Sequence, residues 1–511
     1  MNFLDRLITT LSPRSGLQRR KARLANQAFD KVSKRLYEAA THNHRTEGWI
    51  APQTSANQEN LRAGETLRAR SRELIRNNPY ASRALRIWTS NAIGHGIIPQ
   101  IKCENEFKRN QIETEFEAWA ETTDCDVEGR KNFYEIQSLV FSSVIESGEV
   151  LTRLWRRDSY KKANFQLQVL EIDHLDQWKH QETEKYFTQG GIEFSQSRGE
   201  RMAYWLFAEH PGDQRTFVSS RGLSGRVSGI SSFRIPASEI LHIYRQDRPG
   251  QNFGVPWCAP ILTRLKDFDG FEDAQLRRQI VAAAYAGFLE DIEPPLDVKA
   301  DNHTTTSKIM SGTIQHMPPG KRITFNSPPD SGANYSAYSS HILHAIAVGY
   351  GIPYESLTGD FSQVNFSSGR MGYLEFQRQL DHVRFNMFIP QFCVPVWNCF
   401  ERYLNLKGIS TCDVKTNWVP PRREMIDPVS ETQAMTQMIR SGLITLSDAV
   451  TQFGVDPMDH FQELSQVNSV LDEYGLKLDS DPRYLSQAGK NQMGSQKKER
   501  TQTQGNRCKT Q

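Results

Sequence analysis

The chain has 511 residues, with 62 Lys and Arg against 59 Asp and Glu, so its formal net charge is +3. This length exceeds what one ordinary hydrophobic core can organise and predicts two to four domains. A near-neutral charge argues against a protein that clamps nucleic acid over its whole surface, although local basic patches remain possible.

Residues 1–59 are predicted to form a basic, flexible arm followed by a polar linker. Nine Lys and Arg precede residue 36, against only Asp5 and Asp30. Such an arm is either simply solvated or contacts nucleic acid or an acidic partner, and the pattern leaves both open. His42-Asn43-His44 is superficially similar to a nuclease signature, but no zinc ligands or strand–helix frame flank it.

From Asn60 to about Gln251 the pattern predicts helices followed by short strands, which is typical of an α+β domain. Residues 209–235 are rich in Gly, Ser and Arg and are predicted to be a mobile surface loop. The expected helices are 60–77, 80–92, 107–121 and 133–146, and the expected strands are 97–101, 150–155, 165–172, 203–208 and 239–244.

A long helix is expected over Ala259–Glu290, reaching about 48 Å at 1.5 Å per residue, with Gly270 as a possible kink. A polar insert follows, residues 291–335, with short strands expected at 312–317 and 322–325. Tyr338–Val348 should be the returning helix, ended by Gly349-Tyr350-Gly351 and Pro353. Together these segments predict a helical hairpin that projects from a body.

The stretch from Gly359 to Gly372 is predicted to be a polar loop, which is long enough to suggest a function. It is rich in Ser, Gln, Asn and Gly, and Arg370 is its one cation. Such a surface can touch a polyanion without gripping it. The next helix should bury a stripe spaced by three and four residues: Tyr373, Phe376, Leu380, Val383 and Met387.

Several further predictions concern the C-terminal part of the chain. Pro390 and Pro395 are expected to bend it. Asp427-Pro428 with Glu431 has the pattern of a helix start, and Gly442 that of a helix end. A short helix is expected over 445–453, and the Gln-, Lys- and Ser-rich residues 486–511 are expected to be disordered.

The sequence offers no catalytic or metal-binding constellation. It lacks a phosphate-binding Gly-x4-Gly-Lys-Ser/Thr, a Gly-x-Ser-x-Gly elbow and His-Glu-x-x-His. Asp267-Phe268-Asp269-Gly270 is similar to a calcium loop, but Leu265 and Leu276 stand where ligand oxygens belong. The acidic cluster Asp124, Asp126 and Glu128 is explained equally by a solvated turn and by a metal site.

The seven cysteines predict free thiols in a reducing cytoplasm, because their number is odd and none forms Cys-x-x-Cys. No apolar run approaches the about 20 residues of a membrane span, and no secretory signal is apparent. We therefore expect a soluble, intracellular protein without a cofactor, metal or membrane partner.

Five segments stand out in order across about Asn60 to Pro457. They are ARSRELIRNNPYASRALRIWTSNAIGHGI; EID with LHIY; RPGQNFGVPWCAPILTRLKDFDGFEDAQLRRQIVAAAYAGF; HAIAVGYGIPYESLTGDFSQVNFSSGRMGYLEFQRQ; and PRREMIDPVSETQAMTQMIRSGLITLSDAVTQFG. As an ordered set, these segments resemble the portal proteins of lambda-like tailed bacteriophages. In one departure, Phe253 precedes Gly254 where the family tends to have Arg, so no salt bridge is carried over to that position.

The resemblance implies a ring, normally of twelve subunits, at one capsid vertex, through which double-stranded DNA is packaged and ejected. The implied fold is α+β, a portal fold with an α/β wing, long stem helices, a small β-containing clip and a helical C-terminal crown. The implied division is arm and linker 1–59, wing 60–256, first stem helix 257–290, clip 291–335, second stem helix 336–358, tunnel loop 359–372, wing return helix and strand 373–426, crown 427–485 and disordered tail 486–511.

The resemblance also implies site residues and partners for a structural, non-enzymatic protein. Stem residues would be Arg277 and Arg278, and the implied partners are the terminase, the major capsid protein, scaffold or protease proteins and head-completion proteins. The protein would lie in the virion at the portal vertex, and in the host cytoplasm during assembly. The tunnel-loop residues facing DNA would be Asp360, Ser362, Gln363, Asn365, Ser367, Ser368 and Arg370.

A DNA-processing, nuclease-like enzyme is the alternative, resting on the basic arm and the scattered carboxylates. Rings seen by electron microscopy would favour the portal. Metal-dependent DNA cleavage by a strictly monomeric protein would favour the enzyme.

Overall fold

The computed structural model describes residues 44–156, 165–213, 231–284, 288–291, 321–324, 332–422 and 424–476, with a few isolated positions. Two compact units divide the chain, residues 1–55 and 56–511, and every element named below belongs to the second. The predicted N-terminal arm, His42-Asn43-His44 in large part and the predicted C-terminal tail lie outside the described residues.

The predicted N-terminal helices are confirmed as α3 (Ala56–Asn77), α4 (Pro79–Ala92), α5 (Glu106–Ala120) and α6 (Phe133–Ser147). Local chemistry sets their ends. The Asn78 side chain accepts hydrogen bonds from two backbone N–H groups at the start of α4. Asn132 and Glu135 form a capping box at α6, and Gly148 ends that helix in the left-handed conformation at φ 88°.

Residues 149–244 contain two antiparallel sheets, of which the sequence predicted only part. The predicted strands are β2 (Glu149–Arg156), β3 (Phe165–Glu171) and β9 (Ile240–Tyr244), in the order β3-β2-β9, together with β7 (Arg201–Phe207). β7 belongs to a five-stranded sheet whose other members were not predicted: β4 (Gln181–Glu182), β5 (Tyr186–Gln189), β6 (Ile192–Ser195) and β8 (Ser232–Pro236).

The missed strands have two to five residues, too few for an alternating pattern to stand out from a turn. β8 also corrects the predicted surface loop 209–235, since residues 232–236 pair with β7. The part of that loop from 214 to 230 lies outside the described residues. A buried cluster containing Leu151 of β2 and Leu206 of β7 packs the two sheets together.

A separate pairing joins distant parts of the chain. The predicted strand near residue 97 is β1 (Ile98–Lys102), which pairs antiparallel with β12 (Lys415–Val419), so that Ile98 faces Val419. The 3-10 turns are Thr123–Cys125, Ile172–His174, Ala237–Glu239 and Ala259–Ile261.

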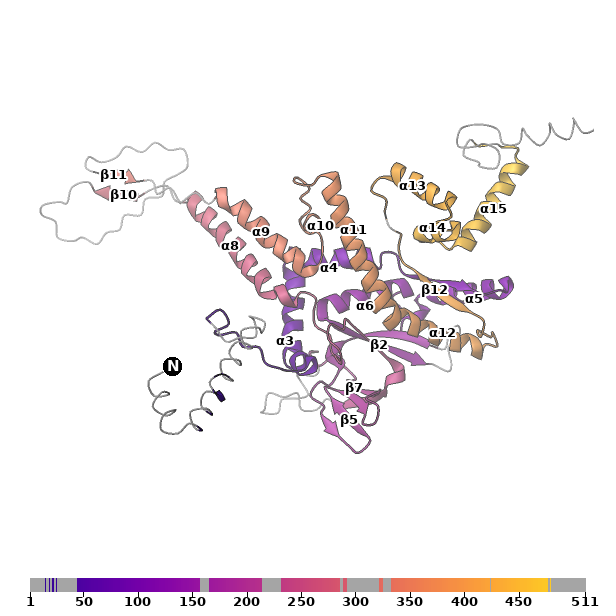
Figure 1. Cartoon of the computed structure of the whole chain (residues 1–511), viewed down its shortest axis with the longest axis horizontal. Helices are drawn as coiled ribbons and strands as arrows, with labels where there is room; N and C mark the ends of the chain where they lie inside the picture. The colour runs from indigo at the N-terminus through magenta and orange to yellow at the C-terminus, as the bar shows by residue number, and fades with distance from the viewer. Residues whose placement is uncertain are drawn as a thin grey trace, which may run out of the picture. The chain divides into compact units, whose positions relative to one another are not determined.

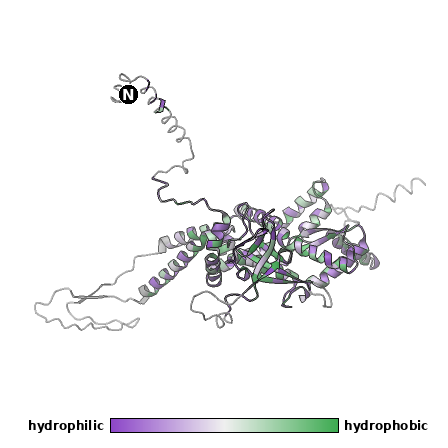
Figure 2. Ribbon diagram, turned by 90° about the horizontal axis from the view of Figure 1, so that it is seen from below, coloured by the Kyte–Doolittle hydropathy of each residue, from purple (hydrophilic) through white to green (hydrophobic). Residues whose placement is uncertain are grey.

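The main core forms where α4, α6, the start of α8 (Leu262–Ala284) and the helices after residue 366 meet. Trp88 is central: its indole N–H donates to the carbonyl oxygen of Tyr350 at 2.8 Å. Its ring meets Trp257 and Phe376 edge-on, with centroid distances of 4.8 and 5.3 Å. In Figure 2 the hydrophobic residues gather in this body, between the helices and the sheets.

The predicted helical hairpin is present as α8 (Leu262–Ala284) and α9 (Gly332–Tyr350), which lie side by side (Figure 1). Phe271 packs against Tyr335 and Tyr338 with centroid distances of 5.9 and 4.9 Å. Near the other end of the pair, a Cβ on Gly349 would come within 2.1 Å of the Ile261 side chain. These contacts join the start of one helix to the end of the other, so the pair is antiparallel.

The predicted boundaries of the hairpin need correction. The first helix does not reach Glu290, because Phe288–Asp291 is the strand β10, paired with β11 (Lys321–Thr324). A short apolar stretch fits a helix or a strand equally, and pairing with a segment 30 residues away decides it. α8 also runs through Gly270 without a break. The strand expected at 312–317 lies outside the described residues.

The predicted end of the returning helix is confirmed, although α9 begins earlier than expected. α9 stops at Tyr350, Gly351 has φ +69°, and the short α10 (Tyr354–Thr358) follows Pro353. The range 336–358, predicted as one stem helix, therefore holds parts of two helices.

One continuous helical run follows: α11 (Phe366–Val383), a π-helix (Arg384–Cys393) and α12 (Val394–Leu406). Pro390 lies within the π-helix and Pro395 in the first turn of α12, so the helical run continues through both prolines. The predicted stripe is confirmed, because Phe376, Leu380, Val383 and Met387 are buried and Tyr373 is half-buried.

Three helices form the C-terminal part: α13 (Pro428–Arg440), α14 (Leu446–Gln452) and α15 (Pro457–Glu473). The predicted start of α13 is confirmed, since Asp427 caps it by accepting the N–H of Ser430. For α15, the sequence predicted no separate helix boundaries. None of the helices among the described residues is long and apolar enough to cross a membrane.

Candidate functional site

The loop predicted over 359–372 is only half as long in the structure. Gly359 closes α10 at φ 76°, and α11 begins at Phe366. The Ser368 N–H donates to Asn365 Oδ1 at 2.8 Å, and the Asn365 N–H donates to Ser368 Oγ at 3.1 Å. This reciprocal capping box places Ser367, Ser368 and Arg370 in the first turns of a helix.

The remaining loop, residues 359–365, is exposed except for the half-buried Val364, and it carries no Lys or Arg. Asp360 accepts the N–H of Ser362 at 3.0 Å, which fixes a local turn. Hydrogen bonding from Ser362 lowers the pKa of Asp360, so the loop is anionic at neutral pH. Phe361 is 66% exposed beside these polar groups. Six of the seven predicted tunnel-loop residues are exposed: Asp360, Ser362, Gln363, Asn365, Ser367 and Ser368.

Arg370, the seventh, faces the C-terminal helices. Its Nη2 lies 3.8 Å from Glu431 Oε1 on α13. One turn further along α11, the Tyr373 hydroxyl donates to the Glu424 carbonyl oxygen at 3.2 Å. A groove of 220 Å³ lies between α11 and these helices, with Met435 and Phe453 among its walls. The one cation of the predicted loop therefore joins α11 to α13.

The predicted stem residues lie near the far end of α8. Arg277 is exposed and Arg278 is half-buried. Leu276 and Ile280 beside them are 60% and 59% exposed, so an apolar strip accompanies the two cations. The structure does not bring these arginines together with the loop at 359–365, which follows α10 on the other side of α9.

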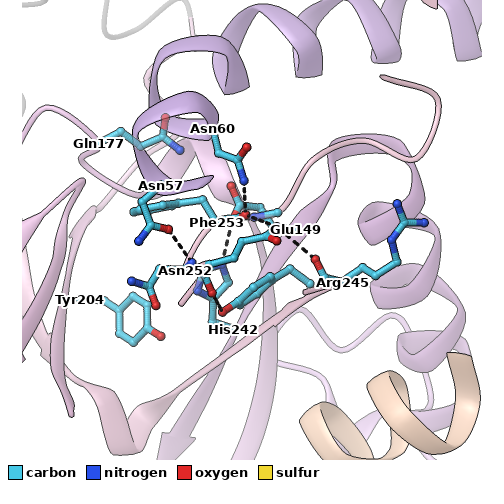
Figure 3. A network of polar contacts seen from close by, with 12 residues as sticks. Asn57, Asn60, Glu149, Gln177, Tyr204, His242, Arg245, Asn252 and Phe253 are labelled. Atoms are coloured by element: carbon cyan, nitrogen blue, oxygen red, sulfur yellow. Dashed lines mark hydrogen bonds and ion pairs between the residues drawn. The ribbon is translucent and has the colours of Figure 1, made fainter. Parts of the chain in front are cut away.

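The segment that leads into α8 is held by a network of polar contacts (Figure 3). The Asn60 amide donates to the Phe253 carbonyl oxygen at 2.8 Å, and the Asn252 N–H donates to Asn57 Oδ1 at 2.7 Å. Gln251 is buried and donates to the same Phe253 carbonyl at 2.8 Å. α3 thus positions the chain just before the hairpin.

A buried carboxylate completes this network. Glu149 Oε2 accepts the Gly254 N–H at 2.8 Å and lies 2.9 Å from His242 Nε2. Burial lowers the pKa of His242, so its neutral ring donates to the carboxylate. Phe253, which stands where the family tends to have Arg, is buried in the second hydrophobic cluster. No salt bridge forms from that position.

Among the described residues, one group could place three ligand atoms around a metal: Glu171, Asp173 and His210. A cation already lies there, because Arg72 Nη2 is 2.6 Å from Asp173 and 3.0 Å from Glu171. Burial opposes the ionisation of Asp173, but the hydrogen bond and charge of Arg72 lower its pKa below the usual value. The group is an ion-pair cluster between α3 and the end of β3.

The other candidate sites of the sequence are structural. Asp126 accepts the backbone N–H groups of Glu128, Arg130 and Lys131, which makes it the organiser of a turn. The calcium-like stretch 267–270 lies within α8. The six cysteines that the structure describes are all free. We find no catalytic constellation in the described ranges.

Comparison with known proteins gives a consistent family. Residues 42–384 match the family described as phage portal protein, lambda family. The probable portal protein of Halomonas phage phiHAP-1 is 26% identical, over 84% of this chain and 86% of that protein. The portal protein of Escherichia phage N15 is 22% identical, over 81% of this chain and 86% of that protein. Portal protein B of Escherichia phage lambda is 21% identical, over 77% of this chain and 82% of that protein.

Among solved structures, the chain is similar to the neck of a native gene transfer agent (GTA) particle, computed with C12 symmetry. The TM-score is 0.43 and the sequence identity is 13%, and the match covers 80% of this chain and 95% of the GTA chain. The neck of the empty GTA particle, computed with C6 symmetry, gives a TM-score of 0.44 at 12% identity. That match covers 79% of this chain and 95% of the GTA chain. The family match spans more than half of the chain, and nothing in the comparisons supports the DNA-processing alternative. This protein belongs to the lambda family of phage portal proteins and is a portal protein of a phage or phage-like particle.

Proposed function

We propose that the chain assembles into a ring of about twelve subunits at one capsid vertex and conducts double-stranded DNA during packaging and ejection. The family match across 42–384 carries this proposal, because it includes the α8–α9 hairpin, the loop 359–365 and the whole of α11. A closed ring needs head-to-tail interfaces, and exposed apolar side chains on α8 offer surface for them.

The loop 359–365 is proposed to line the channel. Each phosphate that a protein neutralises adds salt-dependent affinity, which would slow sliding DNA. The loop carries no cation and one carboxylate, Asp360, so repeated copies would guide a duplex without holding it. Arg277 and Arg278, in the proposed stem, would supply the positive charge further along the channel.

The role is structural, without an enzymatic step. The insert between α8 and α9 is proposed to meet the terminase and later the head-completion proteins, and the wing to meet the major capsid protein and the scaffold or protease proteins. Assembly would start in the host cytoplasm. The helices α13–α15 would form the crown.

Electron microscopy of the purified full-length chain tests the ring. We expect rings with about twelvefold symmetry, in keeping with closed homo-oligomeric assembly. A protein that stays monomeric at high concentration and cleaves DNA in the presence of a divalent metal would refute the proposal.

The channel role of the loop is tested by replacing Phe361–Val364 with two glycines. This change leaves the capping box at Asn365 and the Arg370–Glu431 ion pair intact. We expect normal rings with impaired DNA packaging or retention. A matched control replaces the exposed turn Ser197–Gly199 between β6 and β7 with two glycines and should leave packaging unchanged. If rings fail to form, the loop is a packing element; if packaging is normal, it does not guide DNA.

A further inference from the structure

A groove of 490 Å³ opens between the β2–β3 hairpin and the end of α12, apart from the hairpin and the loop discussed above. Its floor is apolar: Leu154, Phe165 and the ring of Tyr403 are each at most 4% exposed. Leu406 forms part of the rim and is 76% exposed. The groove therefore offers a concave apolar surface beside an unpartnered leucine.

Two arginines, Arg156 from β2 and Arg402 from α12, stand at the groove. Both are exposed, and neither forms a salt bridge with an acidic group in the part of the chain that the structure describes. Cations close by are paired: Arg153 lies 3.8 Å from Glu239, and Lys407 lies 2.7 Å from Glu115. The two groove arginines are thus the ones left for an external anion.

Their charge reaches into the groove. Cys399 lies in its lining and is half-buried. Burial raises the pKa of its thiol, while the positive charges of Arg402 and Arg156 act to lower it. The arginines consequently create a positive potential over an apolar floor.

We propose that this groove binds an acidic peptide segment of another protein, with an apolar side chain on the floor and flanking carboxylates on Arg156 and Arg402. Arginine is well suited to this role, because its planar guanidinium accepts carboxylates in bidentate geometry. The site is independent of the proposed channel, and it would join the wing region to a partner in the particle.

Charge excludes the nearest alternative occupant within the chain. The connection between β2 and β3, residues 157–164, contains Arg157, Lys161 and Lys162 against Asp158. This segment is basic in composition, so its charge does not complement the two arginines. A nucleic acid would match the arginines but would leave the apolar floor without a partner, since phosphates and riboses are polar.

Fluorescence anisotropy on the assembled full-length protein tests the proposal. The probe is a labelled ten-residue peptide of alternating Glu and Leu, and the comparison peptide has Lys in place of Glu. We expect only the acidic peptide to bind, and R156E/R402E to weaken its binding by roughly tenfold or more, as for charge reversal at a complementary interface. The matched control R198E reverses an exposed arginine elsewhere and should stay within about twofold.

Alkylation with iodoacetamide locates the bound peptide. Bound acidic peptide should slow the labelling of Cys399, read by mass spectrometry, and leave that of the exposed Cys412 unchanged. Circular dichroism verifies that each variant is folded.

Several results would overturn the proposal. The Lys peptide could bind equally well, or R198E could weaken binding as much as R156E/R402E, which would make the binding non-specific. A short DNA duplex that competes as effectively as unlabelled acidic peptide would assign the groove to nucleic acid. Binding that occurs only after Asp158–Ala163 is replaced by Gly-Asn-Gly would identify that connection as the natural occupant.

Discussion

At the scale of single residues, two glycines decide how the end of α6 meets the segment that leads into α8. A Cβ on Gly254 would lie 2.2 Å from the Gly148 carbonyl oxygen, and one on Gly148 would lie 2.4 Å from the Val255 carbonyl carbon. Real Cβ atoms do not approach backbone this closely, so any side chain would push the end of α6 away from the segment before α8.

We expect Gly254→Ala to destabilise the fold by about 2–3 kcal/mol, because the clash is with rigid backbone and the Gly254 N–H would also leave Glu149. Gly270→Ala is the matched control, since its Cβ meets nothing within 4 Å on the exposed face of α8. It should stabilise the protein by about 0.5–1 kcal/mol. Thermal unfolding followed by circular dichroism measures both, and equal effects would contradict this account.

Glu113 on α5 is a second informative residue. Burial raises its pKa to about 7. Arg109 opposes this shift, whereas Asp459 of α15, the capping residue Asp456 before that helix, and Glu117 reinforce it. The folded state thus binds this proton more tightly than the unfolded state, whose pKa is near 4.5. The resulting stability is fully present below pH 4.5 and is lost as the pH rises through 7.

Glu113→Gln should therefore flatten the pH dependence of stability between about pH 5 and pH 8, and should stabilise the protein most at the upper end. Thermal midpoints of wild type and variant, measured across this range, give the difference. Glu184→Gln, which changes an exposed glutamate in the turn between β4 and β5, is the control. A difference that grows as the pH falls would contradict the assigned sign.

At the scale of elements, α11 is tied to α13 by Arg370 and Glu431. Both side chains are partly exposed, so the pair contributes modestly, on the order of 0.5 kcal/mol. Its position matters more than its strength, because it lies just after the loop proposed to face DNA. The contact offers a route by which the C-terminal helices could set the orientation of the first turns of α11.

Arg370→Glu should loosen this contact, and the double variant R370E/E431R should restore it, because the charges are then exchanged. Hydrogen exchange at the backbone amides of α13 reads the contact directly and should rise in the single variant alone. Arg378→Glu is the control, since Arg378 pairs with Glu375 on the same helix. Failure of the double variant to restore protection would show that the ion pair does not hold α13.

At the scale of the whole molecule, burial is concentrated before residue 420. The main core cluster ends at Trp418. Beyond Ile426, the described residues contribute only Ala449 and Pro457 to the buried set, and α13 contributes none. The C-terminal helices therefore add little to the apolar surface removed from water.

Truncation after Ile426 should accordingly shift the main thermal transition by only about 2–4 °C, the effect of about 1 kcal/mol. Truncation after Leu406 is the comparison, because it also removes β12, whose Trp418 and Val419 are buried and whose backbone pairs with β1. It should lower the transition clearly further. Calorimetry measures both, and equal shifts would place the C-terminal helices in the main core.

The sequence alone determined what depends on neighbouring residues. Asp427 and Pro428 start α13, Gly349 to Gly351 ends α9, and the stripe from Phe376 to Met387 is buried, because capping groups, prolines and helical periodicity act within a few residues. The ordered segments also identified the family correctly.

Only the tertiary structure decided what depends on partners distant in the chain. Phe288–Asp291 is a strand because Lys321–Thr324 pairs with it, and the short strands beside β7 exist only as members of a sheet. The start of α11 is a different case: its Asn365–Ser368 capping box is local, but Ser368 is not the usual Glu or Gln, so the sequence pattern placed the helix start too late. Arg370 turned to Glu431, 61 residues further along the chain. Neither periodicity nor composition carries such pairings, because they arise only when distant segments come into contact.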